Sequence, residues 1–175
     1  TKKWKTRRKF RSSIASTTRQ IATRAGIGAG TLFVYFPEKR DLLFHLFRSD
    51  VVAIKDTAFA DLPTGTLVDR LCAVFGRYFD YYARDPRLSR IFVKELPFVS
   101  DTDRTPTTAL FLELLGSLAD LFARAQRAGE IDATIPPLAA AYLAFSAYFT
   151  ALVGWLGGTV PMREQLLTVL RGGLE

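Results

Sequence analysis

The chain has 175 residues, of which 49% are hydrophobic and 23% charged, a composition typical of a globular protein and unlike that of a disordered chain. A single cysteine, Cys72, excludes an intrachain disulfide and fits a reducing compartment. The net charge of +7 is unevenly spread: residues 1–48 hold twelve Lys or Arg residues against two carboxylates, so this segment carries +10 and the remainder −3. Such a basic segment indicates a polyanionic partner, either nucleic acid or an anionic membrane. No apolar stretch follows the basic start, so no signal peptide is predicted.

The first predicted elements are three helices separated by short breaks. No stretch alternates apolar and polar residues with period two, so an all-α fold of about nine helices is expected. Thr17 and Gln20 have capping-box spacing and predict a short helix from Thr18 to about Ala25. Gly26 is suited to ending it. A second short helix runs to about Phe36, and a third follows Pro37.

Later elements follow a loop at residues 61–65. Helical spacing of apolar residues predicts five further helices, and a polar stretch at 100–106 predicts a loop between two of them. The expected helices are 66–83, 86–96, 107–128, 136–156 and 161–170.

The stretch from Ile135 to Met162 contains no charged residue, which is long enough for a membrane span. Two prolines open it, glycines interrupt its later part, and alanine dominates its first half. A buried core helix or a dimer helix explains the same composition, and small side chains permit close approach of a partner helix.

Two short helices joined by a glycine-containing turn predict a helix-turn-helix. Its expected core is Ile21, Ala22, Ala25, Ile27, Leu32 and Phe36. The opposite face of the second helix holds Ala29, Gly30, Phe33 and Val34, which suit base edges and thymine methyl groups in a major groove. The basic residues expected to hold the phosphates are Arg19, Arg24, Lys39 and Arg40.

The string TRQIATRAGIGAGTLFVYFPEKRDLL at residues 18–43 resembles the DNA-binding domain of the TetR family. The resemblance is long and gap-free but covers about a sixth of the chain. It implies a helix-turn-helix domain at residues 1–48 and a helical effector-binding and dimerisation domain at 49–175. It also implies a cytoplasmic, sequence-specific transcriptional regulator, normally a repressor that a small molecule releases from a palindromic operator in double-stranded DNA.

The resemblance also implies roles for single residues. The positions that approach bases are Arg19, Ala29, Gly30, Phe33 and Val34. The positions that grip phosphates are Thr18, Thr31, Tyr35 and Lys39. Family members usually carry tyrosine where this chain has Phe33, so a phosphate hydrogen bond from that position is not expected. Residues 1–16 depart from the family pattern and offer little apolar surface for a first helix.

In the second domain the resemblance implies a homodimer formed through 136–156 and 161–170. Plentiful aromatic residues suit an apolar pocket and favour an uncharged lipophilic effector, although such stripes also form ordinary core. The predicted effector-binding residues are Phe75, Tyr78, Phe79, Phe111, Phe122, Tyr142, Phe145 and Phe149.

Catalysis and metal or cofactor binding are not expected. His45 is the only histidine, and no second histidine or cysteine completes a metal site or a nucleophilic pair. Glu113 and Asp120 lie seven residues apart on one predicted helix, as on a solvated face. The remaining alternative is a basic helical protein that binds anionic membrane surfaces or polyanions non-specifically.

Overall fold

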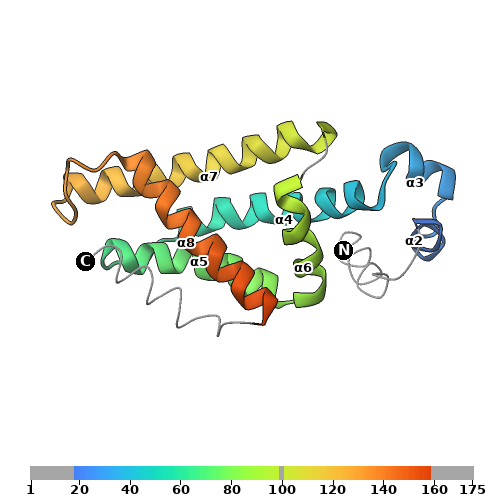
Figure 1. The fold of residues 1–175 in the computed structure, drawn as a ribbon, viewed down its shortest axis with the longest axis horizontal. Helices are drawn as coiled ribbons and strands as arrows, with labels where there is room; N and C mark the ends of the chain where they lie inside the picture. Colours follow the sequence, from blue (N-terminus) through green and yellow to red (C-terminus); the bar gives the residue numbers. More distant parts are fainter. Residues whose placement is uncertain (1–17, 99–100, 159–175) are drawn as a thin grey trace.

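The computed structural model describes residues 18–98 and 101–158, which form seven α-helices, one 3₁₀ helix and no strand. The predicted all-α fold is confirmed (Figure 1). The expected Thr17 cap, the basic start and the last helix at 161–170 lie outside the described residues, so the total of about nine helices stays a prediction. The helices are α2 (Thr18–Ala25), α3 (Ala29–Tyr35), α4 (Lys39–Ala60), α5 (Leu67–Ala83), α6 (Pro86–Glu95), α7 (Asp101–Arg127) and α8 (Pro137–Gly157), with the 3₁₀ helix at Leu96–Phe98.

The helix-turn-helix boundaries follow from local signals in the sequence. Gly26 has φ = 73° and ends α2, a conformation that side chains with a Cβ rarely adopt. Glu38 and Asp41 form a capping box at the start of α4: the Glu38 backbone N–H donates to the Asp41 carboxylate at 2.8 Å. The predicted order of short helix, turn, short helix and longer helix is therefore confirmed.

Helix α4 belongs to both parts of the molecule, and it runs from the α2–α3 end toward the centre of the body (Figure 1). Near its start, Leu42 and Leu43 are buried. One turn later the Phe47 ring stacks on Phe92 of α6, with centroids 4.1 Å apart, and meets the edge of Tyr81 of α5. The predicted boundary after residue 48 falls inside this continuous helix and stays a prediction.

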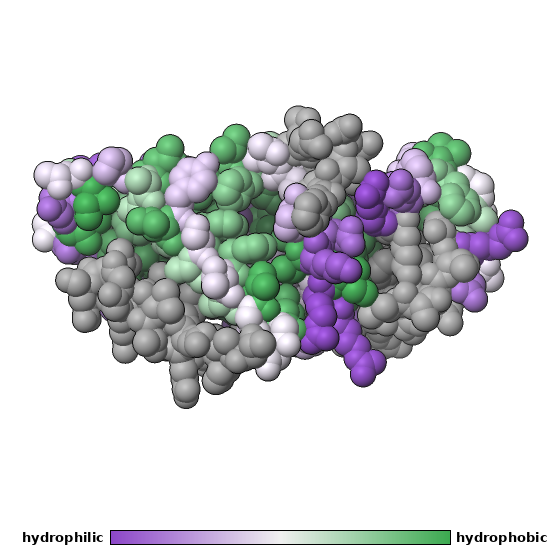
Figure 2. Space-filling model, in the orientation of Figure 1, coloured by the Kyte–Doolittle hydropathy of each residue, from purple (hydrophilic) through white to green (hydrophobic). Residues whose placement is uncertain are grey.

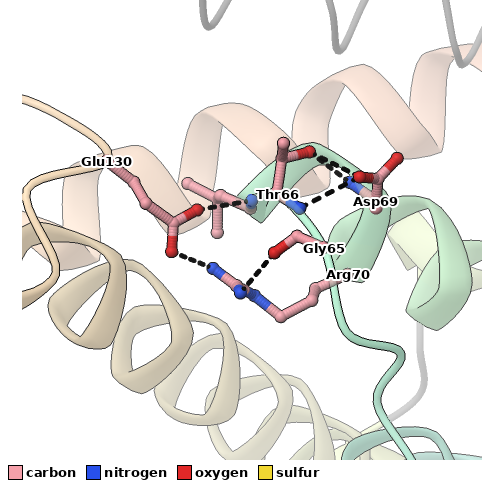
Figure 3. A network of polar contacts seen from close by, with 6 residues as sticks. Gly65, Thr66, Asp69, Arg70 and Glu130 are labelled. Atoms are coloured by element: carbon pink, nitrogen blue, oxygen red, sulfur yellow. Dashed lines mark hydrogen bonds and ion pairs between the residues drawn. The ribbon is translucent and has the colours of Figure 1, made fainter.

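The start of α5 is fixed by a polar network (Figure 3). The Thr66 hydroxyl accepts a hydrogen bond from the Asp69 backbone N–H, while the Asp69 carboxylate accepts from the Thr66 backbone N–H. Glu130, which follows α7, accepts from the Leu67 backbone N–H at 2.8 Å and pairs with Arg70 at 2.6 Å. The network therefore ties the beginning of α5 to the segment after α7.

The structure corrects the prediction of a polar loop at 100–106, because α7 already begins at Asp101 and Pro106 lies inside it. Polarity alone was therefore a poor guide, because a helix start and a loop share the same composition.

Helices α7 and α8 pack against each other and, with α5, enclose the largest buried side chains. Phe75, Leu118 and Phe122 are completely buried. The α7 segment Pro106–Arg127 and α8 are each long and apolar enough to cross a membrane by length and composition. The two helices pack against each other, and 28% and 33% of these apolar windows are buried.

Candidate nucleic-acid interface and ligand pocket

Three consecutive apolar or aromatic residues of α3 are exposed. The exposed fractions are 45% for Phe33, 79% for Val34 and 73% for Tyr35. Leu32 of the same helix points inward and is buried, as is Ala22 of α2. Packing therefore holds α3 by one face and leaves the other free for a partner. Figure 2 shows apolar surface at this outer end of the molecule.

The other predicted DNA-binding residues surround this face. Arg19 and Thr31 are exposed, and Gly30 has open space where a Cβ would be. Ala29 is half-buried against the core. The side chains of Thr18, Lys39 and Arg24 lie outside the part of the chain whose side chains the structure describes. The backbone nevertheless places Thr18 at the start of α2 and Lys39 at the start of α4.

The predicted core of the helix-turn-helix needs one correction. Ile27, in the turn, is 44% exposed and not part of the described core. The turn stands at the outside of the two-helix unit, where Ile27 donates its backbone N–H to the Ala22 carbonyl. Phe36 is half-buried and lies against His45, with ring centroids 5.1 Å apart. Ile21 and Ala25 have side chains outside the described set.

An apolar cavity of about 110 Å³ lies between α4, α5, α6, α7 and α8. Four of the predicted effector-binding residues line it: Tyr78, Phe111, Phe145 and Phe149. The other residues in its wall are Phe44, Arg48, Val51, Tyr82, Phe92, Leu96, Thr107, Leu110, Leu114, Tyr148 and Leu152.

The remaining four predicted effector-binding residues do not line this cavity. Phe75 stacks on Tyr148 from behind, with centroids 4.6 Å apart, and Phe79 meets the edge of the same ring. Phe122 is completely buried. Tyr142 is half exposed and packs its ring against Phe111 at 6.1 Å.

Sequence reasoning missed the contribution of α4 to the cavity. Phe44, Arg48 and Val51 have spacings of four and three residues, so they share one face of α4. That spacing was visible in the sequence, but nothing there indicated that this face would turn toward α7 and α8. Tyr148 was equally recoverable, because it follows the predicted Phe145 by three residues.

A second cavity, of about 240 Å³, lies between the start of α4 and the start of α7. Its wall shares Phe44, Arg48 and Thr107 with the apolar cavity, so the two adjoin there. Tyr35 of α3 lines its other side. The space between the two parts of the molecule is therefore bounded by residues of the candidate DNA interface and of the apolar pocket.

Burial controls the charge state of the pocket tyrosines. Desolvation raises the pKa of Tyr78, and the neighbouring Tyr82 and Asp56 raise it further. Burial likewise raises the pKa of Tyr82 and of Tyr148. All three phenols are therefore neutral at physiological pH and present hydrogen-bonding groups without charge.

Within the described residues, no group of three His, Cys, Asp or Glu side chains is placed to hold a metal ion. The lone His45 is exposed and contacts Phe36 rather than a carboxylate. An exposed apolar face on the second helix of a two-helix unit, within the basic segment of residues 1–48, defines a protein of the helix-turn-helix class.

Comparison with known proteins finds similarity to bacterial transcriptional regulators. The profile described as "Bacterial regulatory proteins, tetR family" matches residues 14–46. The HTH-type transcriptional repressor KstR of Rhodococcus jostii (strain RHA1) is 28% identical over 139 residues, which cover 79% of this chain and 62% of KstR. The chain thus spans less than two thirds of KstR. The fatty acid metabolism regulator protein of Bacillus subtilis (strain 168) is 23% identical over 166 residues, covering 91% of this chain and 86% of that protein.

Solved structures show the same fold. FadR from Bacillus subtilis, in complex with stearoyl-CoA, superposes with a TM-score of 0.75 at 20% identity and covers 97% of this chain and 94% of that one. FadR from Thermus thermophilus, in complex with lauroyl-CoA, gives a TM-score of 0.74 at 19% identity, with coverage of 99% and 93%. The helix-turn-helix segment is thus similar to the tetR-family profile, and the fold as a whole is that of the FadR structures.

Proposed function

We propose that this protein is a cytoplasmic, sequence-specific DNA-binding transcriptional repressor and not an enzyme. The observation that carries the proposal is the exposed face of α3, where Phe33, Val34 and Tyr35 stand outward. Exposing such side chains to water is unfavourable unless a partner covers them, and a major groove offers thymine methyl groups and base edges. The +10 charge of residues 1–48 supplies the attraction to phosphate.

We further propose that two copies associate through α8, as a palindromic operator requires. Helix α8 carries no charge, and its outer face exposes Leu138, Tyr142, Leu143 and Val153. Alanines let a second helix approach closely. The residues at 161–170, predicted to complete the interface, lie outside the described part of the chain.

We infer that a lipophilic effector occupies the apolar cavity and lowers the affinity for DNA. The related FadR structures are complexes with stearoyl-CoA and lauroyl-CoA, so an acyl chain is the occupant to test first. The cavity is lined by Phe44 and Arg48 of α4, the helix that begins beside α3. Displacement of this face of α4 by a ligand would move the DNA-binding helices, because α4 is continuous between the two regions.

The test is selection of genomic DNA fragments by the purified protein at about 0.15 M salt, where purely electrostatic binding is weakened. We expect one palindromic sequence among the bound fragments. Tyr35→Ala should weaken binding to that sequence by roughly ten- to a hundredfold, since a contact at the DNA surface is worth about 1–3 kcal/mol. Leu112→Ala is the matched control, because Leu112 is also an exposed apolar residue but lies on α7.

The two variants separate the possible outcomes. Loss of binding in Tyr35→Ala but not in Leu112→Ala supports recognition through α3. Recovery of fragments without a shared sequence contradicts the proposal and favours non-specific polyanion or anionic-lipid binding by the basic segment. Lauroyl-CoA added to the complex tests the effector: we expect it to release the DNA.

A further inference from the structure

One residue in the wall of the apolar cavity carries a buried polar group without a partner. Tyr78 lines the cavity and is only 3% exposed. Its hydroxyl has no hydrogen-bond partner among the residues that the structure describes. A buried hydroxyl without a partner destabilises a protein, and native proteins seldom retain one without a reason.

A neighbouring tyrosine on the same helix shows the ordinary arrangement. Tyr81 is equally buried, but its hydroxyl donates to the Asp50 carboxylate at 3.1 Å. Tyr81 does not line the cavity. Within one turn of α5, the hydroxyl of Tyr81, which does not line the cavity, is paired, and the hydroxyl of the cavity-lining Tyr78 is not.

The chemistry of the wall restricts what could pair with Tyr78. Burial keeps the phenol neutral, because desolvation raises its pKa, so the group can donate a hydrogen bond. The rest of the wall is aromatic and aliphatic, and its other polar groups are the Tyr82 and Tyr148 phenols and, where the second cavity begins, Arg48 and Thr107. Away from Arg48, a charged group would lose its hydration without compensation, whereas a neutral acceptor would lose less.

We propose that Tyr78 determines effector specificity by donating a hydrogen bond to an uncharged carbonyl oxygen of a ligand whose remainder is apolar. The ligand class is a ketone, ester or thioester with an alkyl chain. This inference rests on the proposed function only in taking the cavity to be the effector site. Alkyl packing supplies affinity, and the Tyr78 hydroxyl distinguishes a carbonyl compound from a hydrocarbon of the same shape.

The first experiment uses the protein without ligand. Tyr78→Phe removes the hydroxyl and keeps the ring, so we expect the melting temperature to stay within about 1 °C of the wild type or to rise. Tyr81→Phe is the control and should lower it by roughly 2–4 °C, because it removes a paired hydroxyl and leaves Asp50 without that donor. A fall in Tyr78→Phe as large as that in Tyr81→Phe would overturn the proposal, since it would mean that the Tyr78 hydroxyl is already paired, for example with a bound water.

The second experiment uses two probes of nearly identical shape, 2-hexanone and 2-methyl-1-hexene, in which C=CH₂ replaces C=O. NMR titration gives the affinity of each for the wild type and for Tyr78→Phe. We expect the ratio of ketone to alkene affinity to fall by roughly three- to tenfold in the variant, with alkene binding unchanged. An unchanged ratio would overturn the proposal, as would binding of hexanoate more tightly than of 2-hexanone.

Neither experiment involves DNA, so its failure is distinct from failure of the proposed function. Selection of an operator together with an unchanged ratio of ketone to alkene affinity would support the proposed regulator and contradict the proposed role of Tyr78. A changed ratio of ketone to alkene affinity without operator binding would support the ligand site and contradict the proposal that the protein is a DNA-binding regulator.

Discussion

The two ends of α4 lie in regions where large apolar side chains differ in their exposure to solvent. In the α2–α3 unit, Val34 and Tyr35 stand largely in solvent. In the body formed by α5 to α8, Phe75 and Phe122 are completely buried. The first region exposes apolar side chains at the surface, and the second surrounds the apolar cavity.

This difference has an energetic consequence. Removing an exposed side chain changes the free energy of unfolding little. The exposed residues of α3 are therefore constrained by binding to a partner and not by stability. The residues behind the cavity contribute to stability, whereas those in its wall contribute to stability and to ligand binding. Mutations on the exposed face of α3 should therefore change DNA binding without changing stability, and mutations of buried residues in the body should change stability.

Substitution of a buried and of an exposed phenylalanine tests whether the two regions differ in their contribution to stability. Phe75→Ala should lower the free energy of unfolding by about 3–5 kcal/mol, because it opens a cavity behind Tyr148. Phe33→Ala removes the same side chain from the exposed face of α3 and should change it by less than about 0.5 kcal/mol. Urea unfolding followed by circular dichroism measures both. Equal losses of unfolding free energy in the two variants would contradict the difference between the two regions.

A smaller effect is expected at the polar network of α5. The Arg70 guanidinium holds the pKa of Glu130 below its ordinary value of 4.5, and the Leu67 backbone N–H lowers it further. Since the pKa is lower in the folded protein, the stabilisation is complete above pH 4.5 and disappears as the pH falls through the folded value. Glu130→Gln should cost roughly 0.5–1 kcal/mol at pH 7 for a partly exposed pair.

The pH dependence provides the check on that prediction. The difference in unfolding free energy between Glu130→Gln and the wild type should shrink when unfolding is measured at successively lower pH from 6 to 3. A difference that stays constant over this range would mean that the Glu130 charge contributes nothing, and that the hydrogen-bond geometry alone matters.

The DNA-binding unit was largely predictable because its determinants are local. Gly26 and the Glu38–Asp41 capping pair fix helix ends within a few residues, and the i,i+4 spacing of Leu32 and Phe36 orients α3. Ile27 was the exception: hydrophobicity placed it in the core, whereas its position in the turn exposes it.

The pocket was predictable only in part because its determinants are long-range. Aromatic spacing placed Phe111, Phe145 and Phe149 on helices, and all three line the cavity. The same spacing in Phe75 and Phe122 belongs to residues behind the wall or in the core. The arrangement of five helices determines which side of each apolar helix faces the cavity. No local sequence pattern encodes this arrangement.

Recognition of DNA by α3 can be tested at Val34, the most exposed of the three α3 side chains. Affinity of Val34→Ser for the selected operator and its free energy of unfolding should be measured together. We expect affinity for the operator to fall roughly tenfold, with affinity for unrelated DNA and stability unchanged, because a contact with base edges is lost and no core contact is. Unchanged operator affinity would contradict the claim that the exposed face of α3 recognises DNA.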